Sequence, residues 1–171
     1  GEALGIIGEI DSSKSLIGRL LSGEIKPDKG KVVRKTDMFF ADIEDKSLLS
    51  LSVSDYVKNV ITLFTYNTSE HKVEQIIKFS HLHDLTNAPI NSLTDQQYAQ
   101  LQFTLARTSR ASIIIMNQIL HNLDESYFEK AIELTDEYIN NNLTIVMIDD
   151  DVNRISRASN YLAWISHGQL R

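Results

Sequence analysis

The residues best suited to chemistry lie near the start of the sequence, in the segment 8–15. Gly8, Lys14 and Ser15 have the types and the spacing of a loop that binds phosphate groups. In such a loop, glycine lets backbone N–H groups face the phosphates, the lysine reaches the terminal phosphates, and the hydroxyl holds Mg²⁺. The positions expected to contact phosphate are Gly8, Ser12, Ser13, Lys14 and Ser15, with Ser15 as the metal ligand.

A strand pattern precedes this loop and a helix pattern follows it. The apolar run Ala3–Ile7 predicts a buried strand. Apolar residues recur at helical spacing from Leu16 to Leu21, and Gly23 stands where that helix would end. Strand, loop and helix in this order are the context that a phosphate-binding loop requires.

Acidic residues inside the loop work against this chemistry. Asp11 and Ser13 occupy positions where such loops carry further glycines, and Glu9 adds a second carboxylate. A carboxylate ~5 Å from a phosphate oxygen repels it by about 0.8 kcal/mol in bulk water, and by more in a partly dry site. Without a phosphate, Lys14 is expected to pair with Asp11.

Length and composition limit the remaining possibilities. A chain of 171 residues with 42% hydrophobic residues is long enough for one substantial core, so we expect a single domain. The net charge of -6 argues against a nucleic-acid partner. Without cysteine there is neither a disulfide nor thiolate chemistry. The sequence begins abruptly at a strand pattern, and upstream strands are expected to be missing.

Strand patterns alternate with helix patterns along the chain. The expected strands are Ala3–Ile7, Lys31–Phe40, Ser112–Met116, Leu143–Ile148 and Tyr161–Ile165. Alternation of this kind predicts an α/β fold with a mostly parallel sheet flanked by helices. The stretch 53–110 has helix patterns such as Val53–Phe64 and no convincing strand. We therefore expect a helical lobe at 53–110, inserted into a sheet core formed by 1–52 and 111–171.

Four further segments have recognisable motifs. Leu93–Gln97 stands at the start of a helix pattern, and Ile113–Gln118 is an apolar run that ends in two amides. His121–Asp124 follows, and Thr144–Asp151 is an apolar run that ends in three acids. In this order they resemble the signature, Walker B, D-loop and switch motifs of the ATP-binding-cassette (ABC) transporter ATPases, and the segment 8–15 is similar to that family's Walker A loop.

The last strand pattern resembles one branch of this family in particular. Ala163, Trp164 and Ile165, before a turn at Gly168, are similar to the branch of the family that exports teichoic acid and polysaccharides. This resemblance covers essentially the whole chain. It implies one P-loop NTPase domain over residues 1–171, acting as the nucleotide-binding subunit of an exporter.

The resemblance also implies a cofactor and partners. An ABC ATPase binds ATP with Mg²⁺ and docks on a membrane subunit, so it lies peripherally on the cytoplasmic side of the membrane. It works as a homodimer or heterodimer in which each nucleotide lies between one subunit's Walker A loop and the other's signature. The signature and D-loop positions implied in nucleotide binding are Leu93, Thr94, Asp95, Gln96, Gln97 and Asp124.

Several motif positions depart from the family pattern. Asn117 replaces the Walker B aspartate, Gln118 replaces the catalytic glutamate, and Asp150 replaces the switch histidine. Loss of a general base typically lowers the rate by roughly 10²–10⁴-fold. In the signature, Asp95 and Gln96 stand where the family has glycines. We expect weak or lost binding of ATP and Mg²⁺, and impaired or absent hydrolysis.

Two alternatives remain open. In the first, the domain is a working ATPase with unorthodox residues, in which Glu44 or Asp150 replaces the base. In the second, it is a scaffold that binds no nucleotide.

The segment expected to hold the family's Q-loop also departs from the pattern. No glutamine occurs between Thr36 and Val57, and Asp42 and Glu44 are the polar residues nearest to that place.

Other polar or aromatic residues have simpler interpretations. We expect Asp149–Asp151 to form a solvated loop and a helix N-cap in preference to a cation site. His81 and His83 have no third ligand nearby and predict an exposed polar turn in preference to a zinc site. Trp164, within a strand pattern, is expected to pack in the core.

Overall fold

One sheet organises the molecule. The computed structural model describes residues 1–9, 13–44, 50–64 and 68–170. In these residues six strands pair in the order β2-β3-β4-β1-β5-β6, and only the β5–β6 pair is antiparallel. The strands are β1 (Glu2–Gly8), β2 (Met38–Asp42), β3 (Ile113–Asn117), β4 (Thr144–Ile148), β5 (Tyr161–Ser166) and β6 (Gln169–Leu170). The prediction of an α/β fold with a mostly parallel sheet is confirmed.

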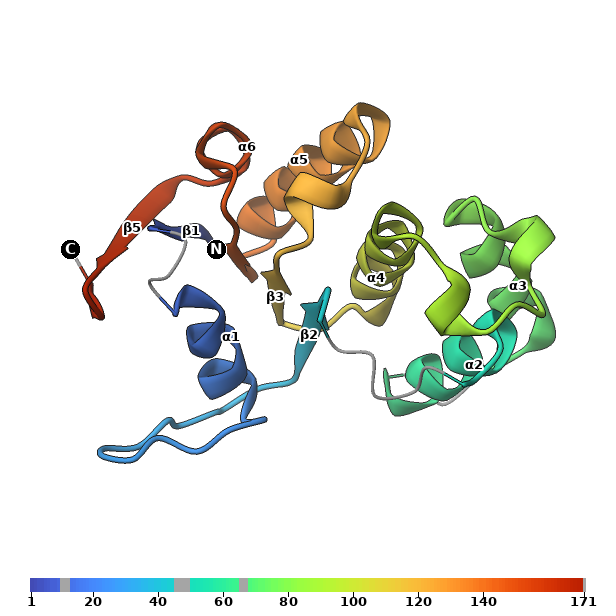
Figure 1. Cartoon of the computed structure of the whole chain (residues 1–171), viewed down its shortest axis with the longest axis horizontal. Helices are drawn as coiled ribbons and strands as arrows, with labels where there is room; N and C mark the ends of the chain where they lie inside the picture. Colours follow the sequence, from blue (N-terminus) through green and yellow to red (C-terminus); the bar gives the residue numbers. More distant parts are fainter. Residues whose placement is uncertain (10–12, 45–49, 65–67, 171) are drawn as a thin grey trace.

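Helices cover both faces of this sheet. They are α1 (Lys14–Ser22), α2 (Val53–Phe64), α3 (Glu70–Phe79), α4 (Asp95–Ser109), α5 (Glu125–Asn140) and α6 (Val152–Ala158). Helix α1 lies on one face, and α5 and α6 lie on the other (Figure 1). Helices α2, α3 and α4 pack against one another beyond β2, which α4 contacts. Short 3-10 helices at His83–Leu85, Ile90–Ser92 and Leu120–Asn122 join the longer elements.

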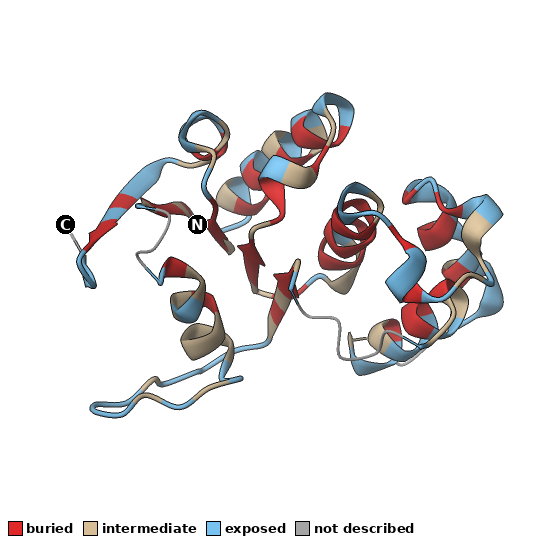
Figure 2. Ribbon diagram, viewed as in Figure 1, coloured by how far each residue is buried: buried red, intermediate tan, exposed pale blue. Residues whose placement is uncertain are grey.

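The core is divided by the sheet into two clusters. The larger one joins the α5 and α6 face to the helices beyond β2, and the smaller one lies beneath α1. Figure 2 shows the buried residues along the strands and on the helix surfaces that face them. Gly5 permits one close approach, because a Cβ at this position would lie 2.4 Å from Cγ2 of Ile155 in α6.

Two expectations about the strands are wrong. The segment 31–37 is not part of β2, which begins at Met38. Arg34 instead donates from its guanidinium to the carbonyls of Leu20 and Leu21 at the end of α1, at 2.7 Å each. Trp164 is 41% exposed, because its face of β5 is covered only by the short helix α6, whereas Ala163 and Ile165 point into the core beneath α1.

Candidate nucleotide site

The ends of four parallel strands bring the motif positions to one edge of the sheet. The pairing register aligns Asp42 with Asn117 and aligns Asn117 and Ile6 with Ile148. The loops that follow these strands therefore lie side by side. Ligands of open α/β sheets bind at this edge, beyond the carboxyl ends of the strands.

Lys14 begins α1 and is almost fully buried, with 2% of its side chain exposed. Its Nζ donates to the carbonyl oxygens of Gly8 at 3.4 Å and Glu9 at 3.1 Å. The same Nζ lies 2.5 Å from Oδ1 of Asp150, whose side chain is 46% exposed. An ammonium group has three N–H donors, and protein oxygens therefore account for all three. Asp11, the partner expected from the sequence, lies outside the described residues, and Asp150 takes that role here.

Of the segment 8–15, the structure describes residues 8, 9 and 13–15. Ser13, at a position where a glycine is expected, has φ of 56°, in the left-handed region that favours glycine. Its side chain is exposed and does not cap α1. Ser15, the expected metal ligand, is half-buried in the first turn of α1. Ser12 lies outside the described residues.

A buried polar group lies at the end of β3, at the position that the sequence resemblance matches to Walker B. Asn117 is fully buried, and its Nδ2 donates to Oδ1 of Asp42 at 3.1 Å. Oδ1 of Asn117 has no hydrogen-bond partner in the described part of the chain. Asp42 also receives the backbone N–H of Glu44 at 3.0 Å and pairs with Nε of Arg19 at 3.4 Å. A buried carboxylate is therefore present at this edge, but on β2 and not on β3.

Gln118, which the sequence resemblance matches to a catalytic glutamate, has a strained backbone conformation. Its φ is 55°, and its backbone N–H donates to the carbonyl of Ile148 at 2.8 Å. Its own carbonyl accepts from Nδ2 of Asn122 at 3.1 Å. The side chain ends in an amide, which carries no proton-accepting carboxylate.

A histidine–aspartate pair lies next to these residues and was not foreseen from the sequence. Nδ1 of His121 donates to Oδ1 of Asp149 at 2.8 Å, and the backbone N–H of His121 reaches Oδ2 at 3.2 Å. Asp149 also accepts the backbone N–H groups of Asp150 and Asp151 at 2.8 and 3.2 Å. The hydrogen bond to Asp149 raises the pKa of His121 above its ordinary value, although partial burial opposes this shift.

The three consecutive acids have different environments. Asp149 is fully buried, so the expectation of a solvated loop is wrong at this position. Its carboxylate is buried because two backbone N–H groups and His121 satisfy it. The expected N-cap is confirmed, because the Asp151 side chain accepts the N–H of Arg154 at 3.0 Å at the start of α6. Within the described residues, no group of three His, Cys, Asp or Glu side chains is placed to hold a metal ion.

The signature and D-loop positions meet at the start of α4. Thr94 caps this helix and forms a reciprocal capping box with Gln97, with distances of 3.0 and 3.2 Å. Asp124 caps α5 and accepts from Nε2 of Gln100 at 2.9 Å and Gln96 at 3.4 Å. The remaining positions are Leu93, which is buried before the cap, and Asp95, in the first turn of α4. The structure thus joins Gln96 to Asp124 and, separately, Lys14 to Asp150.

Several curated sequence relatives of the chain share one name. The chain is 23% identical over 181 residues to the teichoic acids export ATP-binding protein TagH of Listeria monocytogenes serotype 4b, and 22% identical over 173 residues to that of Staphylococcus haemolyticus. All of the chain is covered in both cases, against 52% and 66% of the relatives. The chain spans about half the length of the Listeria relative. No protein-family model matches the chain.

Solved structures share the fold. An ATP-binding cassette solved as a dimer in a post-hydrolysis state with ADP and Pi superposes with a TM-score of 0.80 at 18% identity, over 99% of this chain and 83% of that one. A putative metal-chelate type ABC transporter in an inward-facing conformation gives 0.74 at 20% identity, over 99% and 70%. No helix among the described residues is long and apolar enough to cross a membrane. The chain thus shares its fold with these ATP-binding cassettes, and its sequence is similar over its whole length to the teichoic acids export ATP-binding proteins.

Proposed function

We propose that the chain is the ATP-binding-cassette part of a transporter that exports teichoic acid or a related polysaccharide, and that its own site hydrolyses ATP very slowly or not at all. The transport role is supported by the names of the relatives. The impaired chemistry rests on one observation, which is the ion pair between Lys14 and Asp150.

This ion pair places a carboxylate where Lys14 would meet a terminal phosphate. A bound nucleotide must either displace the Asp150 carboxylate from Nζ of Lys14 or bind with that negative charge next to its phosphates. Two like charges ~5 Å apart repel by about 3 kcal/mol at an effective dielectric constant of about 20. Because Asp150 is half-exposed, solvent screening lowers this energy, and the carboxylate can also swing outward. Binding is therefore weakened.

Hydrolysis is impaired further by the amides on β3. Magnesium and an oriented water are needed at the γ-phosphate. Gln118 supplies no general base, and Asn117 supplies no negative charge near the metal. The carboxylate of Asp42 does not replace it, because it is already bound to Asn117 and Arg19. The hydroxyl of Ser15 is then the one expected metal ligand that this loop retains.

The two residues considered as substitutes for the base are also engaged. Oε2 of Glu44 pairs with NH2 of Arg19 at 2.9 Å, and Asp150 pairs with Lys14. Proton abstraction from water requires a free carboxylate or imidazole within hydrogen-bond reach. These ion pairs therefore favour a pseudo-ATPase over a working enzyme with unorthodox residues.

The dimeric cassette among the structural neighbours supports a paired arrangement. We propose that the chain pairs head to tail with a second copy or with another ATP-binding subunit, and docks on the transporter's membrane subunit at its cytoplasmic side. Asp95 and Gln96 would then face the partner's nucleotide, with a negative charge where the family has a glycine. Both composite sites would be impaired.

Turnover and binding measurements on the full-length protein test this proposal. Wild type and Lys14→Ala are compared for phosphate release and for heat of binding with Mg–ATP. We expect wild type to release phosphate from ATP no faster than Lys14→Ala does. Turnover at an ordinary transporter rate that collapses in Lys14→Ala would show a working ATPase. Heat of binding without turnover supports the pseudo-ATPase, whereas absence of heat and of a thermal shift supports the scaffold alternative.

A further inference from the structure

One cavity of the described residues lies outside the motif region. Its volume is about 750 Å³, and residues of α3, α4 and α5 line it. Four of its lining side chains are cationic, namely Lys72, Arg107, Arg110 and Lys130, and none is acidic. Cavities of about 300–1,000 Å³ are the size that small-molecule ligands occupy. The cavity therefore has the volume of a ligand site and one sign of charge.

This concentration of positive charge is unusual for the chain. Acidic residues outnumber Lys and Arg by 23 to 17 over the whole sequence. Arg19, Arg154 and Arg157, by contrast, are each paired with an acid. None of the four cations at the cavity forms an ion pair within the described residues. A low-dielectric wall lined by one sign of charge raises the local concentration of anions.

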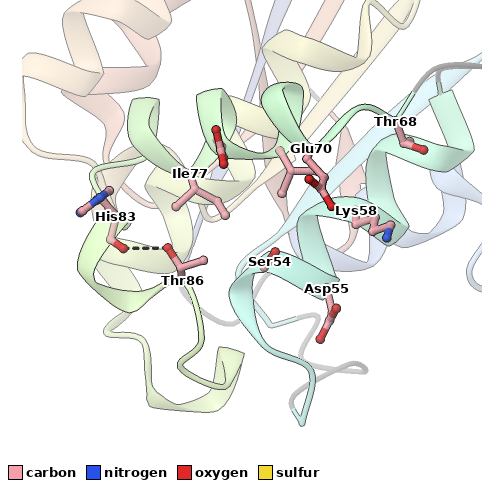
Figure 3. Close-up of a pocket in the computed structure, with 10 residues that line it drawn as sticks. Ser54, Asp55, Lys58, Thr68, Glu70, Ile77, His83 and Thr86 are labelled. Carbon is pink, nitrogen blue, oxygen red and sulfur yellow. Dashed lines mark hydrogen bonds between the residues drawn. The ribbon is translucent and has the colours of Figure 1, made fainter.

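A second cavity provides a contrast within the same group of helices. It lies between α2 and α3, with a volume of about 280 Å³ (Figure 3). Asp55, Glu70 and Glu74 line it together with Lys58 and His83. Its charges are thus mixed, as on an ordinary solvated surface. An excess of cations is therefore a property of the larger cavity and not of these helices in general.

Aromatic side chains give the larger cavity an apolar wall. The rings of Phe103 and Tyr127 are buried and meet edge to face, with centroids 6.1 Å apart. The ring of Phe79 is 67% exposed, and its carbonyl accepts the Tyr127 hydroxyl, which ties α3 to α5. Nζ of Lys130 lies 4.3 Å from the centroid of Tyr127. Burial raises the pKa of Tyr127 to about 12, so this phenol stays neutral and does not repel an anion.

We propose that this cavity binds an organic phosphate ester, with the phosphate group held by Arg107, Arg110 and Lys72 and the ring or acyl body packed on the exposed ring of Phe79. The planar fork of an arginine matches two phosphate oxygens, and a neighbouring lysine adds a further donor. An inorganic anion alone would leave the aromatic wall unused, and an uncharged body would leave the cations unused. The site is independent of the nucleotide site, because Lys14 is not part of it.

Naphthyl phosphate is a suitable probe, because it combines a phosphate monoester with an apolar ring. The intact protein is titrated with naphthyl phosphate, naphthol and inorganic phosphate by fluorescence and calorimetry. We expect naphthyl phosphate to bind more tightly than either of the other two. Naphthol that binds as tightly as its ester, or an ester that does not bind at all, would refute the proposal.

Charge-neutral variants locate the site. Arg107→Gln with Lys130→Gln is compared with Lys58→Gln plus Lys78→Gln, which changes the net charge equally at positions outside the cavity. We expect the first pair to raise Kd for naphthyl phosphate at least about tenfold, or about 1.4 kcal/mol, and the second pair to leave it unchanged. Equal effects of both pairs would contradict a specific site.

A vesicle experiment then distinguishes the two sources of such an ester. Sedimentation with phosphatidylcholine vesicles containing phosphatidic acid is compared with sedimentation on phosphatidylcholine alone. If the acidic vesicles retain wild type but not the Arg107→Gln, Lys130→Gln variant, the cavity takes a lipid phosphate headgroup. If wild type and the variant differ in their Kd for naphthyl phosphate but not in their binding to vesicles, the cavity takes a free ester. Lys14→Ala, as a control for the nucleotide site, should bind naphthyl phosphate like wild type, and loss of binding in this variant would contradict an independent site.

Discussion

Asp42 and Asn117 lie side by side at the carboxyl ends of β2 and β3, joined by a 3.1 Å hydrogen bond and buried from solvent. The sequence resemblance to ABC ATPases predicts an aspartate at the position of Asn117, whereas the buried acid beside it lies on the neighbouring strand β2. The acid on β2 is neutralised by Arg19 at the edge of the pair. The cation of Arg19, the carboxylate of Asp42 and the uncharged amide of Asn117 therefore follow one another across this edge.

Restoring the family residue on β3 should therefore destabilise the fold. In Asn117→Asp, two buried carboxylates would face each other where an amide now donates a hydrogen bond. We expect the free energy of unfolding, measured with urea, to fall by about 2–4 kcal/mol at neutral pH.

The matched variant exchanges the two side chains. Asp42→Asn combined with Asn117→Asp restores one carboxylate and one amide, so it should regain part of the stability lost in Asn117→Asp. Additive losses in the double variant would show that the two side chains do not interact.

Asp150→Asn should strengthen nucleotide binding while it weakens the fold. Removal of this charge frees Nζ of Lys14 for a phosphate, and we expect Kd for Mg–ATP to fall at least about tenfold by calorimetry. The same change leaves a buried ammonium without its counter-charge, which costs about 1–3 kcal/mol without nucleotide. Asp136→Asn, which removes an exposed acid from α5, is the control for net charge. An unchanged Kd in Asp150→Asn would show that this residue does not obstruct the phosphate position.

The fold was predictable from the sequence because its signals are local. Apolar runs of strand length alternate with helix patterns, and Val53–Phe64 was predicted with the bounds that the structure has. The failures occurred where a tertiary contact overrides the local pattern. Arg34 caps α1 in place of extending β2, and Trp164 is exposed because only a short helix covers its side of the sheet.

The candidate site was predictable only as a set of positions. Motif spacing indicated Lys14, Asn117 and Asp150, but it could not show that the lysine and the aspartate pair with each other, since they lie 136 positions apart in the sequence. The pair of His121 and Asp149 was missed for the same reason. The available signal was the alignment of strand ends, which brings the residues after β3 and β4 together. Cavities formed by several helices, such as the cationic one, leave no such local signal.

The stability of the fold should depend on the protonation of His121. Its pKa is raised in the folded protein by Asp149, so protonation favours the folded state. This contribution is fully present below the unfolded pKa of about 6.5 and is lost as the pH rises through the higher folded pKa. His121→Asn should flatten the decline of unfolding free energy in that window, as measured with urea at several pH values. Asn122→Ala removes the neighbour of Nε2, 2.9 Å away, and a donor to the carbonyl of Gln118, but it leaves the pair with Asp149 in place, so the decline should persist. An unaltered slope in His121→Asn would assign the pH dependence to other groups.

The same substitution at two neighbouring serines should have opposite effects on stability. Ser13 has φ of 56°, a conformation in which an L-residue is strained by roughly 1–2 kcal/mol and glycine is not. Glycine also makes the unfolded chain more flexible, so we expect Ser13→Gly to raise the free energy of unfolding by no more than about 1 kcal/mol. Ser15 lies within the first turn of α1, where Ser15→Gly should lower it by about 0.5–1 kcal/mol. Urea unfolding of both variants decides the matter, because a loss of stability in Ser13→Gly would mean that the loop does not hold this residue in the left-handed conformation.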